Sequence, residues 1–163
     1  MKAEHHPDNS RRLEILRSYG VLDTERERDF DDVVALASKL CETPVSLISL
    51  VDENRQWMKA AIGVNWTETP MEQAICAHAI LSDGYFEVND TLADPRTADN
   101  PLVAAADGAR FYAGAALVSP EGLPLGTLCV LDHKPRQLTD LQRETLQVLA
   151  RQVMAQLEMR HKG

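Results

Sequence analysis

The spacing of apolar residues predicts two helices near the beginning of the chain. In the first, expected over about 9–19, Leu13 and Leu16 lie on one face and Gly20 ends the element. The second begins near residue 27 with several acidic residues in its first turn, which suits the helix dipole. Its apolar positions recur every three or four residues: Phe30, Val33, Val34, Ala37, Leu40 and Cys41.

A long amphipathic helix is expected at the other end of the chain, over about 139–160. Thr139 and Gln142 have the three-residue spacing of a capping box at its first turn. Its main apolar stripe comprises Leu146, Leu149, Val153 and Leu157. A second apolar edge, with Leu141, Val148 and Met159, either points to solvent or meets a partner helix.

The middle of the chain predicts antiparallel strands that are joined as hairpins. Short apolar runs over 45–51 and 56–62 flank a polar turn. The segment 110–132 predicts a second hairpin, because Pro120 and Gly122 occupy the second and fourth positions of a type I turn. Strands that arrive as hairpins indicate an antiparallel sheet.

Three other segments lie between the two hairpins. We expect a helix over 69–81, a short strand over 85–90 and a turn-rich loop with one helical turn over 91–110. A loop of this length inside a compact domain is often functional.

These elements predict an α+β fold, a central antiparallel sheet of five or six strands with helices on both faces. We expect one domain over 1–163, with its core over about 27–135.

Many strand residues are small: Ser46, Ser49, Ala113, Gly114, Ala115, Ala116, Gly126, Thr127 and Cys129. Such residues either let a helix approach closely or leave a cavity.

Composition and charge exclude several classes of partner. A net charge of −8 without a basic cluster argues against nucleic acid. No apolar stretch approaches the roughly 20 residues of a membrane helix, and the polar N-terminus lacks a signal core, so no membrane partner is expected. Three irregularly spaced cysteines do not form a disulfide framework, which favours a cytoplasmic location.

The pair Cys76 and His78 raises the question of a metal site or a catalytic thiol. Two residues two positions apart on a helix point about 200° apart. They cannot easily share one ion, and no further ligands have the right spacing, so no metal is expected. Cys76 is either a buried small residue or part of a pocket wall, and His78 either tethers a loop or contacts a ligand.

Five short motifs resemble those of bacterial GAF domains, which stand beside histidine kinases and diguanylate cyclases. They are "LVDENRQWMKAAIG", "ICAHAIL", "DPRTADNPLV", "RFYAGAALVSPEGLPLGTLCVLDHKPR" and "LQVLARQVMAQLEMR", in that order. The resemblance implies an antiparallel sheet with the first and last helices on one side. On the other side it implies a helix and loops around a small-molecule pocket. It also implies a homodimer through the terminal helices and a possible output domain or kinase partner, as in two-component systems.

The chain departs from the family pattern at a few positions. Ala74 and Ile75 replace a Ser-Phe pair, Met58 replaces a Phe and Ala116 replaces a Pro. The signatures of bilin-binding and cyclic-nucleotide-binding GAF domains are absent. The ligand is therefore not identified.

Several residues are candidates for the ligand site. The loop residues Asp94, Arg96 and Asn100 either cap turns or form a lid, and Arg110 is a candidate anion contact. Trp57 and Phe111 either belong to the core or close the cavity. The full predicted set is Ser49, Trp57, Cys76, His78, Asp94, Arg96, Asn100, Arg110, Phe111, Thr127 and Cys129.

The sequence favours a sensory or regulatory module that binds a small molecule in signal transduction and does no catalysis. One alternative is a thiol-dependent reductase on the same fold, similar to the GAF enzyme that reduces free methionine sulfoxide. That function would use Cys76 and Cys129 as its thiols. Another alternative is a dimerisation module with an empty pocket.

Overall fold

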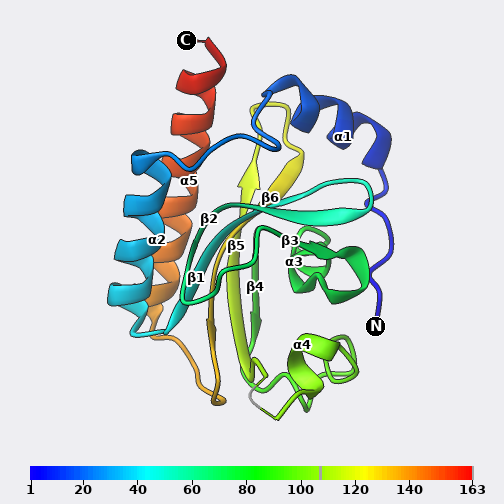
Figure 1. Cartoon of the computed structure of the whole chain (residues 1–163), viewed down its shortest axis with the longest axis vertical. Helices are drawn as coiled ribbons and strands as arrows, with labels where there is room; N and C mark the ends of the chain where they lie inside the picture. The colour runs from blue at the N-terminus through cyan, green and yellow to red at the C-terminus, as the bar shows by residue number, and fades with distance from the viewer. Residues whose placement is uncertain (107, 163) are drawn as a thin grey trace.

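The structure is a computed structural model that describes residues 1–106 and 108–162. A six-stranded antiparallel sheet forms the middle of the fold (Figure 1). Its strands are β1 (Val45–Val51), β2 (Arg55–Ile62), β3 (Glu68–Pro70), β4 (Tyr85–Val88), β5 (Phe111–Val118) and β6 (Pro124–Asp132). They lie in the order β3-β2-β1-β6-β5-β4, so the hairpins β1–β2 and β5–β6 meet through their β1 and β6 strands. This arrangement confirms the predicted α+β class.

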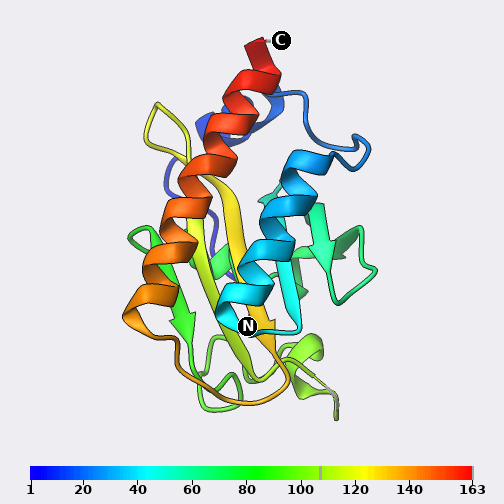
Figure 2. The same ribbon diagram turned by 90° about the vertical axis from the view of Figure 1, so that its left-hand side faces the viewer.

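The helices divide between the two faces and one end of the sheet. They are α1 (Asn9–Ser18), α2 (Arg28–Cys41), α3 (Ile75–Ala79), α4 (Pro101–Ala104) and α5 (Asp140–Lys162). Helices α2 and α5 run side by side over one face (Figures 1 and 2). The opposite face carries α3 and, near its lower end, α4 (Figure 1).

The position of α1 differs from the family expectation that the first and last helices share one side. Helix α1 lies at the end of the sheet beside the β5–β6 turn (Figure 1), and its C-cap residue Tyr19 reaches the last turns of α5, where its hydroxyl donates to Glu158. There the buried Arg12 donates to the carbonyl of Pro124 at 3.4 Å. Helix α2 takes the expected place next to α5 instead, because its apolar residues continue the core under both helices.

The segment 69–81 is a second correction, because it is not one continuous helix. Its first two residues belong to β3, a 3₁₀ turn covers Met71–Gln73, and α3 has only five residues. Ala74, between the two helical pieces, has extended backbone angles (φ −88°, ψ 97°). Its side chain is buried against the sheet. Contact with the sheet therefore overrides the helical propensity of this stretch.

The sheet separates two hydrophobic cores. On one face Leu50, Phe111 and Leu128 pack under α2 and α5. On the other face Leu47, Met58 and Tyr112 belong to the core that contains α3. The sheet is therefore buried on both sides, in agreement with the predicted helices on both faces. No helix among the described residues is long and apolar enough to span a bilayer.

Candidate functional site

Six buried residues with polar or sulfur-bearing side chains form a cluster between the sheet and α3, which we call the inner polar cluster. They are Ser49, Gln56, Cys76, Tyr112, Thr127 and Cys129. The Cys76 thiol donates to the side-chain oxygen of Gln56, and the Tyr112 hydroxyl lies 3.2 Å from Thr127 Oγ1. Ser49 is opposite Thr127 in the β1–β6 ladder. Four of the predicted ligand residues therefore meet here.

The two thiols of the cluster are held in their neutral form. Burial raises the pKa of Cys129 to about 12 and the pKa of Cys76 well above its usual value. The hydroxyl groups nearby offset only part of this effect. A reactive cysteine needs a lowered pKa, so the cluster suits binding or packing better than thiol chemistry.

A cleft of about 260 Å³ opens beside the cluster, and we call it the Trp66 cleft. Trp66 from the β2–β3 connection, Leu102 from α4 and Leu131 from β6 line it. A void of about 10 Å³ shares these three residues and reaches Gln56 and Tyr112 of the cluster. This void is barely large enough for one water molecule, so the cluster is closed while the cleft beside it is open.

Tyr112 fills the space that the small strand residues leave. A Cβ atom at Gly114 would lie 2.6 Å from the Tyr112 hydroxyl oxygen, so the ring lies over the glycine. The Tyr112 ring also meets Phe86 edge-on, with 6.0 Å between the ring centres. The absence of a side chain at Gly114 therefore provides room for Tyr112, which occupies the centre of this face.

His78 and Arg96 lie at a separate open pocket of about 250 Å³ beside Phe86. Arg96 binds the Asp94 carboxylate through two bonds of 3.0 and 2.6 Å, which hold the pKa of Asp94 below its usual value. The Arg96 guanidinium also lies 4.5 Å from the centre of the Phe86 ring. His78 Nε2 lies 2.7 Å from the Met1 carbonyl oxygen, and burial lowers the pKa of His78. These contacts fit the loop-tethering interpretation.

Asn100 and Arg110 support α4 and do not line the Trp66 cleft. The Leu102 N–H donates to Asn100 Oδ1 at 2.9 Å, so Asn100 caps the helix. Arg110 donates to the carbonyl groups of Val103 and Ala105, the latter at 3.0 Å. Both predicted residues therefore position one wall of the cleft.

Trp57 and Phe111 lie on the other face of the sheet, in the core under α2 and α5. The structure does not bring them to the inner polar cluster. Their neighbours Gln56 and Tyr112 belong to the cluster instead, and sequence reasoning missed both. Consecutive residues of a strand point to opposite faces, so Phe111 and Tyr112 of β5 cannot both face the cluster. This alternation was the signal in the sequence that could have indicated Tyr112. Trp66 and Leu102 were also missed. Trp66 lies outside the family motifs, and Leu102 lies within "DPRTADNPLV", where only the polar residues were singled out.

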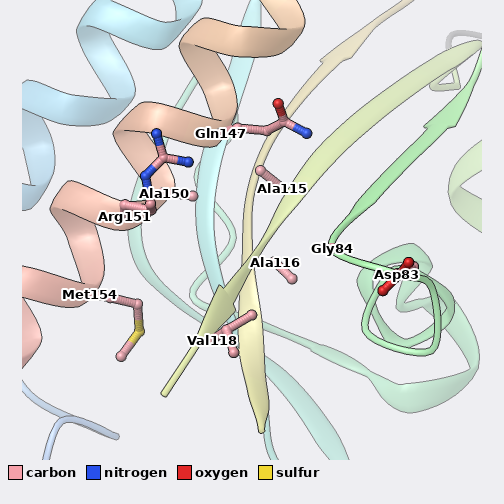
Figure 3. Close-up of a pocket in the computed structure, with 9 residues that line it drawn as sticks. All are labelled: Asp83, Gly84, Ala115, Ala116, Val118, Gln147, Ala150, Arg151 and Met154. Carbon is pink, nitrogen blue, oxygen red and sulfur yellow. The ribbon is translucent and has the colours of Figure 1, made fainter. Parts of the chain in front are cut away.

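A larger hollow of about 470 Å³ lies between α5 and the β4 side of the sheet. Figure 3 shows Ala115, Ala116 and Val118 of β5 on one side and Arg151 and Met154 of α5 on the other. None of the predicted ligand residues lines it. Its floor is made of small residues, so part of the space left by the alanines stays open here.

Within 1–106 and 108–162, no group of three or more His, Cys, Asp or Glu side chains is placed to hold a metal ion. The three cysteines, Cys41, Cys76 and Cys129, are free thiols.

A family model describes this arrangement. The GAF domain model matches residues 25–157, and the chain belongs to the GAF domain family. That match covers all six strands together with helices α2 to α4 and most of α5.

One curated relative is a cyclic di-GMP phosphodiesterase of Pseudomonas aeruginosa. It is 42% identical over 151 residues, which cover 92% of this chain and 26% of the relative. The chain therefore spans about a quarter of the length of this relative.

Solved structures with low sequence identity share the fold. The GAF domain of an Acinetobacter phosphoenolpyruvate-protein phosphotransferase has a TM-score of 0.69 at 15% identity and 96% coverage of both chains. The free methionine-R-sulfoxide reductase of Neisseria meningitidis has a TM-score of 0.67 at 19% identity and 99% coverage of both chains. A GAF domain of a phosphotransferase and a methionine sulfoxide reductase therefore share this architecture, and fold alone does not choose between a binding domain and an enzyme.

Proposed function

We propose that this chain is a sensory or regulatory GAF domain that binds a small molecule in bacterial signal transduction without transforming it. The observation that supports this most is the Trp66 cleft leading to the inner polar cluster. An apolar opening that ends at a few convergent polar groups is typical of ligand sites. The ligand would bias the packing between this face and the helices, which is a population shift.

The chemistry of the site favours a ligand that is small and largely apolar. Gln56 and Gln73 offer amide groups and Tyr112 offers a hydroxyl, while the other side chains around the inner void are apolar or a buried thiol. Asp132 and His133 lie at the cleft itself, where a polar end of the ligand would be solvated. We propose that the ligand enters past Trp66 and displaces Tyr112.

The domain would act on an output partner in the cytoplasm. The relative of known activity is a cyclic di-GMP phosphodiesterase, so an enzyme of cyclic-dinucleotide signalling is the output that we favour over a histidine kinase. The three free thiols fit a reducing compartment.

We further propose a homodimer through α5. Its outward residues Leu141, Thr145, Val148, Gln152, Ala155 and Met159 follow alternating steps of four and three, which is the seam of a coiled coil. Leu141 and Met159 are 73% and 66% exposed, so the seam is not used within one copy. The second apolar edge of the long helix is therefore open to a partner helix.

The reductase alternative rests on the presence of Cys76 and Cys129 in one cluster. Their raised pKa values oppose it, because thiolates are needed for that reaction. We expect no turnover of free methionine sulfoxide with a thiol reductant. Turnover that is lost on Cys76→Ser would establish the enzyme instead.

The two tryptophans provide a test, because only Trp66 lines the cleft and Trp57 is buried on the opposite face. A Trp57→Phe variant is titrated with small, largely apolar compounds that carry one polar end, apolar free amino acids among them, and with cyclic di-GMP as a large, charged comparison. We expect a saturable change in Trp66 emission with at least one compound. The Trp66→Phe variant, which reports from Trp57, is expected to show none. Saturable binding by calorimetry without a Trp66 signal would place the ligand elsewhere.

A further inference from the structure

A lysine is buried at an irregularity of the strand that borders the inner polar cluster. Ile48 pairs with Ala60 and Ser49 with Met58, so Lys59 is the extra residue of a β-bulge in β2. Lys59 is only 1% exposed. Lysine is almost never buried to this extent without partners.

The segment between α1 and α2 supplies these partners. The Lys59 ammonium donates to Thr24 Oγ1 at 2.8 Å and to the Glu25 carbonyl, and it forms an ion pair with Glu27. It also lies 5.6 Å from the centre of the Phe30 ring of α2. All these contacts lie on the face of the sheet opposite to the inner polar cluster.

Glu27 forms ion pairs both with Lys59 and with Arg160, which lies near the end of α5. Arg160 donates through Nε to the Glu27 carboxylate at 2.8 Å. Burial raises the pKa of Glu27, but the hydrogen bonds from Lys59 and Arg160 outweigh it, and the net pKa is lowered. One ionised carboxylate therefore contacts both the sheet and the last turns of α5, where Arg160 also donates to the carbonyl groups of Tyr19 and Gly20 at 3.5 and 3.4 Å.

Met58, the residue before Lys59, contacts the inner polar cluster. The Ser49 hydroxyl lies 3.5 Å from Met58 Sδ, and Gln56 Nε2 lies 3.8 Å from it. Two consecutive residues at one bulge thus join the candidate ligand site to the anchor of the C-terminal helix. A bulge is a place where a strand changes its local course without losing the ladder on either side.

We propose that Lys59, Glu27 and Arg160 form a relay through which displacement of Met58 loosens the end of α5. The proposal rests on the proposed function, in which a ligand at the inner polar cluster causes the displacement. In one state Glu27 binds both cations. In the other the bulge moves the Lys59 ammonium away, and Glu27 and Arg160 lose their fixed position.

Amide hydrogen exchange near Arg160, followed by mass spectrometry, tests the relay without any ligand. Lys59→Met and Glu27→Gln are each expected to speed exchange there about tenfold, which corresponds to the low end of a charge-assisted hydrogen bond. The control Asp32→Asn removes a carboxylate of α2 that pairs with the exposed Arg28, and is expected to change nothing there. Unchanged exchange in both relay variants would overturn the proposal.

The coupling between the inner polar cluster and the end of α5 is tested by a substitution at Met58. Met58→Ala is expected to speed exchange at the end of α5 in the natural sequence and to add nothing in the Lys59→Met background. Exchange in the middle of α2 serves as the internal reference for general loosening. Val88→Ala, at another buried site on the same face of the sheet, is the matched control and is expected to leave the end of α5 unchanged.

An equal effect of Met58→Ala in both backgrounds, or none in either, would contradict the relay. These outcomes are independent of whether a small molecule binds. Failure of the relay is therefore distinguishable from failure of the proposed function.

Discussion

At the scale of single residues, Tyr112 keeps the inner polar cluster closed. Its hydroxyl contacts Thr127, and its ring lies over Gly114. The ring thus fills the room that a ligand would need. On this face the ring of Tyr112 explains the missing side chain at Gly114, and between β5 and α5 part of the space beside Ala115 and Ala116 stays open.

A Gly114→Ala substitution tests this packing. The added methyl group would lie 2.6 Å from the Tyr112 hydroxyl oxygen, and the fully enclosed ring cannot move away without strain. We expect a loss of about 2 kcal/mol in the free energy of unfolding, measured with urea. The loss is expected to shrink in a Tyr112→Phe background, because the nearest colliding atom is gone. An equal loss in both backgrounds would contradict this packing.

The buried Cys129 makes stability depend on pH in the alkaline range. Burial raises its pKa from 9.0 to about 12, so the folded chain keeps a proton that the unfolded chain releases. The stabilisation is complete below pH 9 and is lost as pH rises toward 12. At pH 10.5 the loss from this one group is about 2 kcal/mol.

Urea unfolding at pH 8 and pH 10.5 under reducing conditions checks this value. Cys129→Ala is expected to lower stability at both pH values and to show a smaller alkaline loss than the natural sequence. A loss of the same size in both chains would show that Cys129 does not carry the effect.

The sequence located the candidate site to within one residue at two positions. It pointed to Trp57 and Phe111, whereas Gln56 and Tyr112 reach the cluster. Neighbouring strand residues face opposite sides, and only the packing of the two layers tells which side holds the pocket. Ser49, Thr127 and Cys129 are three of the small strand residues that the sequence analysis named, and the structure brings them to one face of the sheet.

At the scale of elements, local sequence patterns were sufficient to predict the two hairpins and the long C-terminal helix. The turn after β5 has the expected bond from the Gly122 N–H to the Ser119 carbonyl, at 2.8 Å. The capping box of α5 is complete, because Thr139 and Gln142 exchange bonds of 3.1 and 2.9 Å. The segment 69–81 could not be predicted in this way. Its pairing with β2 and its contact with the sheet are long-range effects.

The capping box predicts that replacing Thr139 by alanine lowers the free energy of unfolding, whereas replacing Thr145 does not. Thr139→Ala removes the acceptor for the Gln142 N–H and is expected to lower the free energy of unfolding by about 1 kcal/mol. The control Thr145→Ala removes a hydroxyl that bonds back to the Leu141 carbonyl inside the helix. Its effect is expected to be neutral or slightly stabilising, because alanine favours the helix more. Equal costs in urea unfolding would contradict the capping role.

At the scale of the whole molecule, the sheet separates two hydrophobic cores, one under α2 and α5 and the other containing α3. Helices α2 and α5 lie together over one face, and α3 with α4 lies over the other (Figures 1 and 2). A change on the α3 face would reach the proposed partner on α5 across the sheet or through the ends of the helices. The bulge at Lys59 lies on one such path.

The proposed α5 seam predicts the oligomeric state. We expect the natural chain to be a dimer by size-exclusion chromatography with light scattering at high concentration. Val148→Lys would place like charges together at the seam, beside Arg151, and is expected to give a monomer. Leu81→Lys, at an exposed leucine just after α3, is the matched control and is expected to stay dimeric. A monomer in the natural sequence, or a dimer that survives Val148→Lys, would contradict the seam.

The most direct test of a ligand site at the Trp66 cleft is native mass spectrometry of the freshly purified protein. The native mass is compared with the denatured mass for the natural sequence, for Leu102→Trp, which fills the cleft, and for Leu92→Trp, which alters an exposed leucine outside the cleft lining. We predict extra mass that disappears on denaturation in the natural sequence and in Leu92→Trp, and that is absent in Leu102→Trp. A bare mass in all three chains, or the same extra mass in Leu102→Trp, would contradict a ligand site at this cleft.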